Sequence, residues 1–183
     1  MSLDPRLQTL LDKQDIYELM CRYCRGVDRM DLALVRDCFW PGAIDVHVGQ
    51  GGRLWTGTAD EFFDDNWAFF GEFTASQHHL CNMLIEVEGD RAIAETYQFS
   101  FYWREPGDNP AWNRQNSNRY VDRFERRDGE WRISRREFIR NFSLPIQPGG
   151  FPDAMNGWLR LSQSRDDLAY QTVDSPVRPV TPR

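Results

Sequence analysis

The stretch HHLCNMLIEVEGDRAIAETYQFSFYW, residues 78–103, decides the fold class of this chain. Both of its halves are rich in β-branched and aromatic residues, and Gly89-Asp90 between them is a turn pair typical of a β-hairpin. Two further stretches of similar composition follow at residues 114–126 and 130–142. We therefore predict an antiparallel meander of four long strands in the second half of the chain.

The segment before this meander carries helical patterns. Apolar residues between positions 12 and 28 recur at the spacing of one helix face. A short second helix over residues 32–39 is expected, with Asp31 as its N-cap, and Thr58-x-x-Glu61 is a capping box that opens a third helix. Helices followed by a meander predict an α+β fold, in which the N-terminal helices pack on one face of a curved antiparallel sheet.

The composition fits one domain followed by an extension. The chain has 183 residues, of which 14% are aromatic, and this is more ring surface than a core of this size needs. A roomy apolar pocket would use it. We expect the domain to span residues 1–143, because prolines and glycines accumulate in residues 144–183. This extension is predicted to pack on the domain or the pocket mouth, through Trp158, Leu159 and Leu161, with its last ten residues loose.

Charge and cysteine content exclude several classes of partner. A net charge of −6 gives no general attraction to nucleic acid or anionic membranes. The sequence has no run of 18 apolar residues and no secretory signal core, so a cytoplasmic protein is expected. Four cysteines fit a reducing compartment. The pair Cys21-x-x-Cys24 lies inside a helical pattern without a second such pair or a nearby histidine, so no metal site is predicted.

Arginines gather in the last two strands of the meander, where they alternate with apolar residues. We predict that they lie on a solvated sheet face or pair with neighbouring glutamate and aspartate residues. The residues concerned are Arg123, Arg126, Arg127, Arg132, Arg135, Arg136 and Arg140.

Histidine occurs only three times in the chain, as His47, His78 and His79. The last two stand side by side at the start of a strand. Asp28 lies at the edge of the buried face of the first helix, near its C-terminus, where the helix dipole costs a carboxylate about 0.3–1 kcal/mol. A protonatable histidine would compensate it, and Asp plus His is a minimal general base. One-dimensional spacing leaves open whether these residues meet.

Strand alternation separates the two neighbouring histidines. His78 shares a predicted face with Leu80 and Asn82, whereas His79 shares one with Cys81 and Met83. Asn82 can donate to a substrate oxygen beside His78, or bond to neighbouring backbone.

The following strand has a mixed face that suits a site, which includes Tyr102. Its other face is apolar and suits a core or a subunit contact. If this face is a subunit contact, a homodimer or homotrimer is expected. The apolar face carries Tyr97, Phe99, Phe101 and Trp103.

Three segments together resemble the SnoaL-like branch of the nuclear transport factor 2-like superfamily, which includes scytalone dehydratase and γ-hexachlorocyclohexane dehydrochlorinase. They are DIYELMCRYCRGVDRMD (residues 15–31), HHLCNMLIEVEGDRA (78–92) and NRYVDRFERRDGEWRIS (118–134). The resemblance extends over about residues 10–143. It implies a cone-shaped α+β barrel with a pocket between the helices and the concave sheet.

The resemblance also implies roles for particular residues. In the lyases of this family an aspartate at the end of the first helix supports a histidine, which removes a proton so that water or halide leaves. The matching positions are Asp28 and His78, with His79 as the alternative if the register shifts by one. Arg119 is placed in the pocket, to bind an anionic leaving group or substrate oxygen, with a surface ion pair as its alternative. Further pocket candidates are Tyr23, Val27, Trp40, Asn82 and Tyr102.

These observations predict a cofactor-independent lyase of dehydratase, dehydrohalogenase or retro-aldol type, or an isomerase, acting on a hydrophobic aromatic or cyclic small molecule. The alternative is a non-catalytic ligand-binding module or the small subunit of a ring-hydroxylating dioxygenase, which needs no Asp–His pair. A carboxylate-to-imidazole contact within about 3.2 Å inside a closed pocket favours the enzyme.

Overall fold

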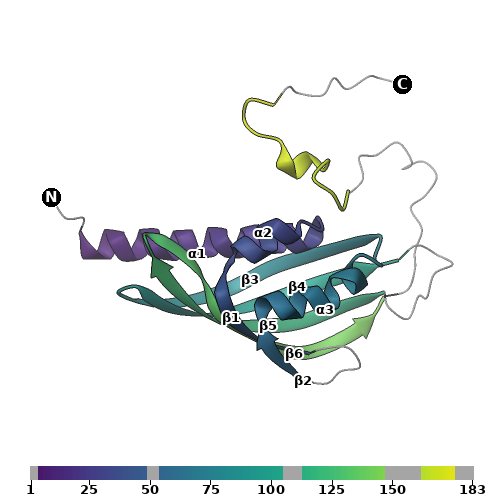
Figure 1. Cartoon of the computed structure of the whole chain (residues 1–183), viewed down its shortest axis with the longest axis horizontal. Helices are drawn as coiled ribbons and strands as arrows, with labels where there is room; N and C mark the ends of the chain where they lie inside the picture. Colours follow the sequence, from purple (N-terminus) through teal and green to yellow (C-terminus); the bar gives the residue numbers. More distant parts are fainter. Residues whose placement is uncertain (1–3, 49–53, 105–112, 147–161, 176–183) are drawn as a thin grey trace.

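A computed structural model describes residues 4–48, 54–104, 113–146 and 162–175. Three helices lie against one side of a curved six-stranded sheet (Figure 1). The helices are α1 (Pro5–Asp28), α2 (Leu32–Asp37) and α3 (Ala59–Phe70). The strands are β1 (Phe39–Val48), β2 (Leu54–Thr58), β3 (Ala75–Glu88), β4 (Arg91–Trp103), β5 (Arg114–Arg127) and β6 (Glu130–Pro145).

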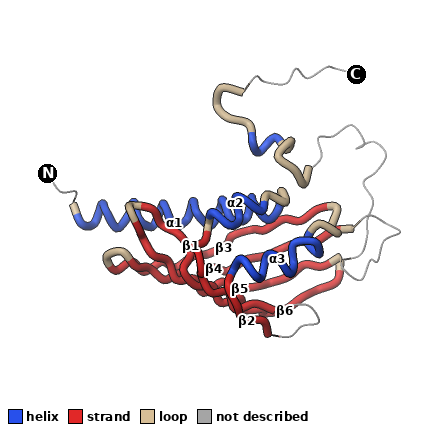
Figure 2. The backbone as a smooth tube through the Cα atoms, viewed as in Figure 1, coloured by secondary structure: helices blue, strands red, loops and turns tan. Residues whose placement is uncertain are grey.

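The sheet is mixed and open, with strand order β2-β1-β6-β5-β4-β3. The strands from β3 to β6 form the predicted meander with antiparallel neighbours, and the single parallel pair joins β1 to β6. Figure 2 shows how far the long strands extend beneath the helices. The predicted α+β class, with helices on one face of a curved sheet, is confirmed.

Local sequence signals fix the helix ends. Thr58 and Glu61 form the predicted capping box of α3, and Asp31 caps α2 by accepting from the backbone N–H of Leu34. Helix α1 begins earlier than the apolar pattern predicts, because Asp4 caps it and Pro5 suits the first helical position.

Gly26 allows α1 and α2 to pack closely. A Cβ atom at this position would lie 2.7 Å from Cγ2 of Val35 and 3.1 Å from its backbone nitrogen. Because the clash involves backbone, a larger residue would force the two helices apart. This close approach fixes the end of α1, where Asp28 lies.

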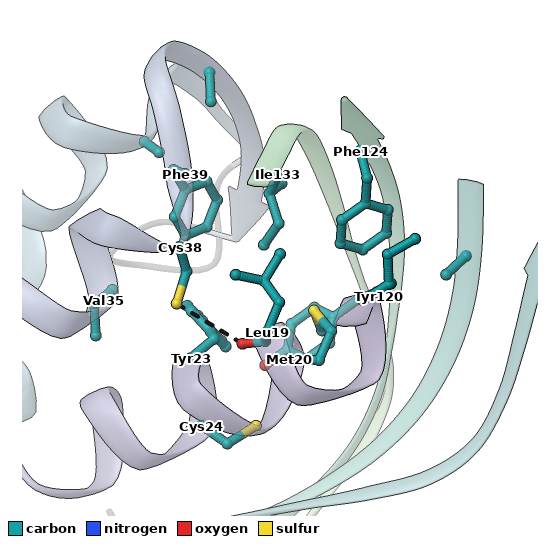
Figure 3. Close-up of a cluster of buried hydrophobic side chains, with 14 of the residues drawn as sticks. Leu19, Met20, Tyr23, Cys24, Val35, Cys38, Phe39, Tyr120, Phe124 and Ile133 are labelled. Atoms are coloured by element: carbon teal, nitrogen blue, oxygen red, sulfur yellow. Dashed lines mark hydrogen bonds between the residues drawn. The ribbon is translucent and has the colours of Figure 1, made fainter. Parts of the chain in front are cut away.

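The core fills the space between the three helices and the sheet, and Figure 3 shows part of it. The thiol of Cys38, at the end of α2, donates to the backbone carbonyl of Leu19 in α1. All four cysteines are free. The labelled core residues of Figure 3 are Leu19, Met20, Tyr23, Cys24, Val35, Cys38, Phe39, Tyr120, Phe124 and Ile133.

A fully buried ion pair crosses from β5 to β6 beside this core. Nε and Nη2 of Arg136 each donate to the carboxylate of Asp122 at 2.8 Å, and both side chains are 0% exposed. The Arg136 guanidinium lies 4.1 Å from the ring centroids of both Tyr23 and Tyr120. Its charge is therefore compensated by a carboxylate and two aromatic rings.

The apolar face of β4 points away from the helices. Thr96, Gln98 and Ser100 are buried on the helix-facing side, whereas Phe99 and Phe101 are half-buried on the outer side. Association of two or three copies through that outer face stays a prediction.

Part of the C-terminal extension contacts the connection between α1 and α2. Arg165 and the hydroxyl of Tyr170 donate to the Asp31 carboxylate, and Arg29 pairs with Asp167 at 3.2 Å. The predictions for Trp158, Leu159 and Leu161 and for residues 176–183 lie outside the described residues. Within the described residues, no helix combines the length and apolar character needed to cross a membrane.

Candidate active site

A cavity of about 840 Å³ lies between the helices and the concave face of the sheet. This volume falls in the range of small-molecule sites. Aromatic rings from α3, the following loop and β6 form most of its apolar wall, namely Phe62, Phe69, Phe70, Phe73 and Phe138.

The end of α1 brings Asp28 against the first turns of β3. The carboxylate accepts from Nδ1 of His78 at 2.6 Å and from the His78 backbone N–H at 2.9 Å, and the Ser76 hydroxyl donates to it at 3.3 Å. The side chains of His78 and Asp28 are 5% and 13% exposed. The contact expected from the helix dipole is thus present, with three donors on one carboxylate.

The hydrogen bonds of His78 define its tautomer. A carboxylate can only accept, so Nδ1 carries the proton, and in the neutral ring the lone pair lies on Nε2. Nε2 lies 3.2 Å from the hydroxyl of Tyr102, which is the donor to this lone pair. Burial, with the Asp28 charge as a smaller cause, raises the pKa of Tyr102 above its usual value, so its hydroxyl keeps its proton at neutral pH. The chain therefore runs from Tyr102 through His78 to Asp28.

Asn82 does not share a face with His78, and the predicted alternation is wrong at this point. A bulge between Leu80 and Met83 places one extra residue in β3. Beyond it the sides of the strand exchange, so Met83 packs against the core and Asn82 is exposed on the outer face.

Three other candidates also lie away from the cavity. Arg119 is on the outer face of β5, where it pairs with Glu95, so the surface ion pair is the arrangement present. Trp40 donates its indole N–H to the backbone carbonyl of Glu125 at 2.9 Å. His79 is exposed and packs edge-on against Phe101.

The remaining candidates do line the cavity. Tyr23 and Val27, from the last turns of α1, contribute to its wall together with His78 and Tyr102. Tyr23 is held edge-on against Phe39 by ring packing. Helix α1 therefore supplies both the Asp28 carboxylate and part of the pocket surface.

A second histidine lines the same cavity and was not among the candidates. His47 of β1 is stacked between Phe62 and Phe138, with ring centroids 4.2 and 4.1 Å away, and Nδ1 donates to the buried carboxylate of Asp45 at 3.2 Å. The sequence sign was available, because a histidine two residues after an aspartate on a strand shares its face. His47 is thus also held with Nε2 unprotonated.

His47 makes stability depend on pH. Burial lowers its pKa below the ordinary value, although the bond to Asp45 opposes this shift. The unfolded histidine, with a pKa near 6.5, takes up a proton that the folded one resists, so the free energy of unfolding falls as pH decreases below about 6.5. A His47→Gln variant should show a shallower decrease between pH 7 and pH 5 in urea unfolding. Equal slopes in both proteins would contradict this assignment.

Two arginines that were not predicted as pocket residues also reach the cavity. Arg114 of β5 and Arg140 of β6 line it together with Asn116, Asn118 and Ser143. Within the described residues no cluster of histidine, cysteine, aspartate or glutamate is arranged to hold a metal ion.

An open, curved sheet with helices over its concave face and one aromatic cavity between them defines the nuclear transport factor 2-like class of α+β domains. Residues 8–137 match the SnoaL-like domain, and the chain belongs to that family. Comparison with curated proteins gave no match.

Solved structures with the same fold include enzymes of two kinds. A provisionally named scytalone dehydratase from Novosphingobium aromaticivorans is 17% identical with a TM-score of 0.65, over 77% of this chain and 91% of that one. A type 2 hexachlorocyclohexane dehydrochlorinase is 20% identical with a TM-score of 0.68, over 84% and 99%. The type 3 enzyme from Novosphingobium barchaimii is 21% identical with a TM-score of 0.64, over 80% and 98%.

Proposed function

We propose that this protein is a cofactor-independent lyase or isomerase, in which His78 removes a proton from carbon of a hydrophobic small molecule. The observation that carries the proposal is the Asp28–His78 contact of 2.6 Å beside an aromatic cavity. A positioned base of this kind contributes roughly 10²- to 10⁴-fold in rate. Dehydratase and dehydrochlorinase activities are named for proteins of the same fold.

In the proposed reaction, Nε2 of His78 takes the proton as the C–H bond breaks. The electron pair forms the new double bond, and the leaving group departs with its own bonding pair. Asp28 stabilises the imidazolium that results, because its carboxylate accepts from Nδ1. The proton on Nε2 then passes to the leaving group or to solvent. In an isomerase, the proton returns to another carbon instead.

Tyr102 is the group that we assign to developing negative charge. Its hydroxyl keeps its proton and lies beside Nε2 of His78, so a bound substrate that displaces it from Nε2 meets a hydrogen-bond donor. The ring packs against Phe73 with centroids 4.9 Å apart, which fixes its position. The aromatic walls exclude water from this step and favour an apolar substrate body.

A Tyr102→Phe variant should lose about 10- to 100-fold in kcat while it remains folded, because one hydrogen bond to a developing charge is removed and the ring packing is kept. Steady-state kinetics with the best substrate checks this, with thermal melting as the folding control. An unchanged kcat would remove Tyr102 from the proposed chemistry.

A substrate screen tests the proposed function as a whole. Aromatic β-hydroxy and β-halogenated carbonyl compounds are incubated with the protein in D₂O, and both elimination and deuterium uptake next to the carbonyl are followed by NMR. Deuterium uptake reports proton removal even where no group leaves. Binding without turnover or exchange for every compound would favour a non-catalytic ligand-binding module.

A further inference from the structure

Polar side chains from β5 and β6 form a strip in the lining of the cavity. Arg114 and Arg140 lie in this strip, and both are among the residues that line the cavity. Nη1 of Arg140 donates to Oδ1 of Asn116 at 3.2 Å, and Nη1 of Arg114 donates to the Ser143 hydroxyl at 3.4 Å. These partners are neutral, so neither charge is compensated by them.

Several other arginines of the same two strands are paired with carboxylates, although Arg123 has no ion pair with a described residue. Arg126 pairs with Asp12 and Asp90, and Arg135 pairs with Glu137. In the part of the chain that the structure describes, Arg114 and Arg140 have no carboxylate within ion-pair distance. The lining does include two acidic residues, of which Asp65 is exposed and Glu72 pairs with Arg104.

The charge of Arg114 acts on Arg140, and the charge of Arg140 acts on the tyrosine that is bonded to the base. Burial is the main cause that lowers the pKa of Arg140, and the positive charge of Arg114 lowers it further. Arg140 also acts electrostatically on Tyr102, the hydrogen-bond partner of His78. These are two like charges in a partly desolvated site, in a chain of net charge −6. A bound anion would compensate both of them.

We infer that the molecule bound in this cavity carries a carboxylate, which Arg114 and Arg140 hold while the aromatic wall holds its apolar body. Guanidinium groups match a carboxylate geometrically and bind it through charge-assisted hydrogen bonds. The inference rests on the proposed function, since it names the substrate class of the same cavity: an aromatic or cyclic acid, bound with its carboxylate at the arginines and its reacting carbon toward His78.

Equilibrium binding tests this without any turnover. Benzoate, cinnamate and 1-naphthoate are each compared with the corresponding neutral amide by calorimetry at low salt. At least one acid should bind the wild-type protein about 10- to 100-fold more tightly than its amide. The Arg114→Gln/Arg140→Gln variant should lose this preference while amide binding stays the same.

Arg119→Gln is the matched control, because it removes the same charge from the outer face of β5 and should keep the preference. Thermal melting verifies that each variant is folded. The inference is overturned if no acid binds more tightly than its amide, or if the double variant keeps the preference.

His78→Ala separates this inference from the proposed function. This variant should keep the acid preference, since an alanine at 78 leaves both guanidinium groups in place. A kept preference together with unchanged turnover in His78→Ala would contradict only the proton-transfer proposal. Lost turnover in His78→Ala without any acid preference in the wild type would contradict only the carboxylate site.

Discussion

Replacing His78 by alanine is expected to lower kcat by about 10²- to 10⁴-fold, because the base that removes the proton is lost. The change should leave folding intact, since His78 is at the cavity and not in the core cluster. The measurement is kcat and KM for the best compound from the substrate screen. Equal turnover by the wild type and the variant would exclude His78 as the base.

His79→Ala is the matched control for this prediction. The two residues are neighbours on β3, but His79 is exposed on the outer face and should be replaceable with little change in kcat.

Asp28→Asn should also lower kcat, because an amide can present a donor to Nδ1 and favour the wrong tautomer.

Replacing Asp122 by leucine is expected to cost about 3–5 kcal/mol of unfolding free energy. The substitution leaves the Arg136 guanidinium buried and without its carboxylate. Urea unfolding of both proteins at the same pH measures the difference. A cost below about 1 kcal/mol would mean that the Arg136 charge does not need Asp122.

Two further variants show whether the cost comes from the unpaired charge. Asp122→Leu combined with Arg136→Met removes both charges and keeps an apolar chain between Tyr23 and Tyr120, so it should be more stable than Asp122→Leu alone. Arg119→Met breaks a partly exposed pair on the outer face and should cost about 1 kcal/mol or less. A double variant less stable than Asp122→Leu would contradict the explanation.

Much of the fold follows from local signals in the sequence. The turn at Asp128-Gly129 has positive φ at both residues, as an Asp-Gly pair favours, and the capping box at Thr58 and Glu61 is present. The contact between Asp28 and His78 agrees with the placement of Asp28 at the edge of a buried helix face and with the family resemblance, which assigns His78. The turn, the capping box and the buried helix face each depend on residues within one short stretch of chain, so the sequence shows them directly.

The wrong predictions concern the sides on which Asn82 and Arg140 lie, and these depend on how neighbouring strands pair. The bulge between Leu80 and Met83 reverses the side on which Asn82 lies, and nothing in the local composition marks it. The side to which each residue of β5 and β6 points depends on how these strands pair, and their register also shifts between Ser117 and Asn118. The sequence alone therefore does not distinguish Arg140, which lines the cavity, from the other arginines of β5 and β6.

The tautomer of His78 in the unliganded protein tests the proposed base most directly. Nitrogen-15 NMR of the imidazole distinguishes a protonated nitrogen from one with a free lone pair. With Asp28 accepting from Nδ1 at 2.6 Å, the neutral ring should carry its proton on Nδ1. Its Nε2 should then be unprotonated. A neutral ring protonated on Nε2 would contradict it, since that nitrogen could then accept no proton from a substrate.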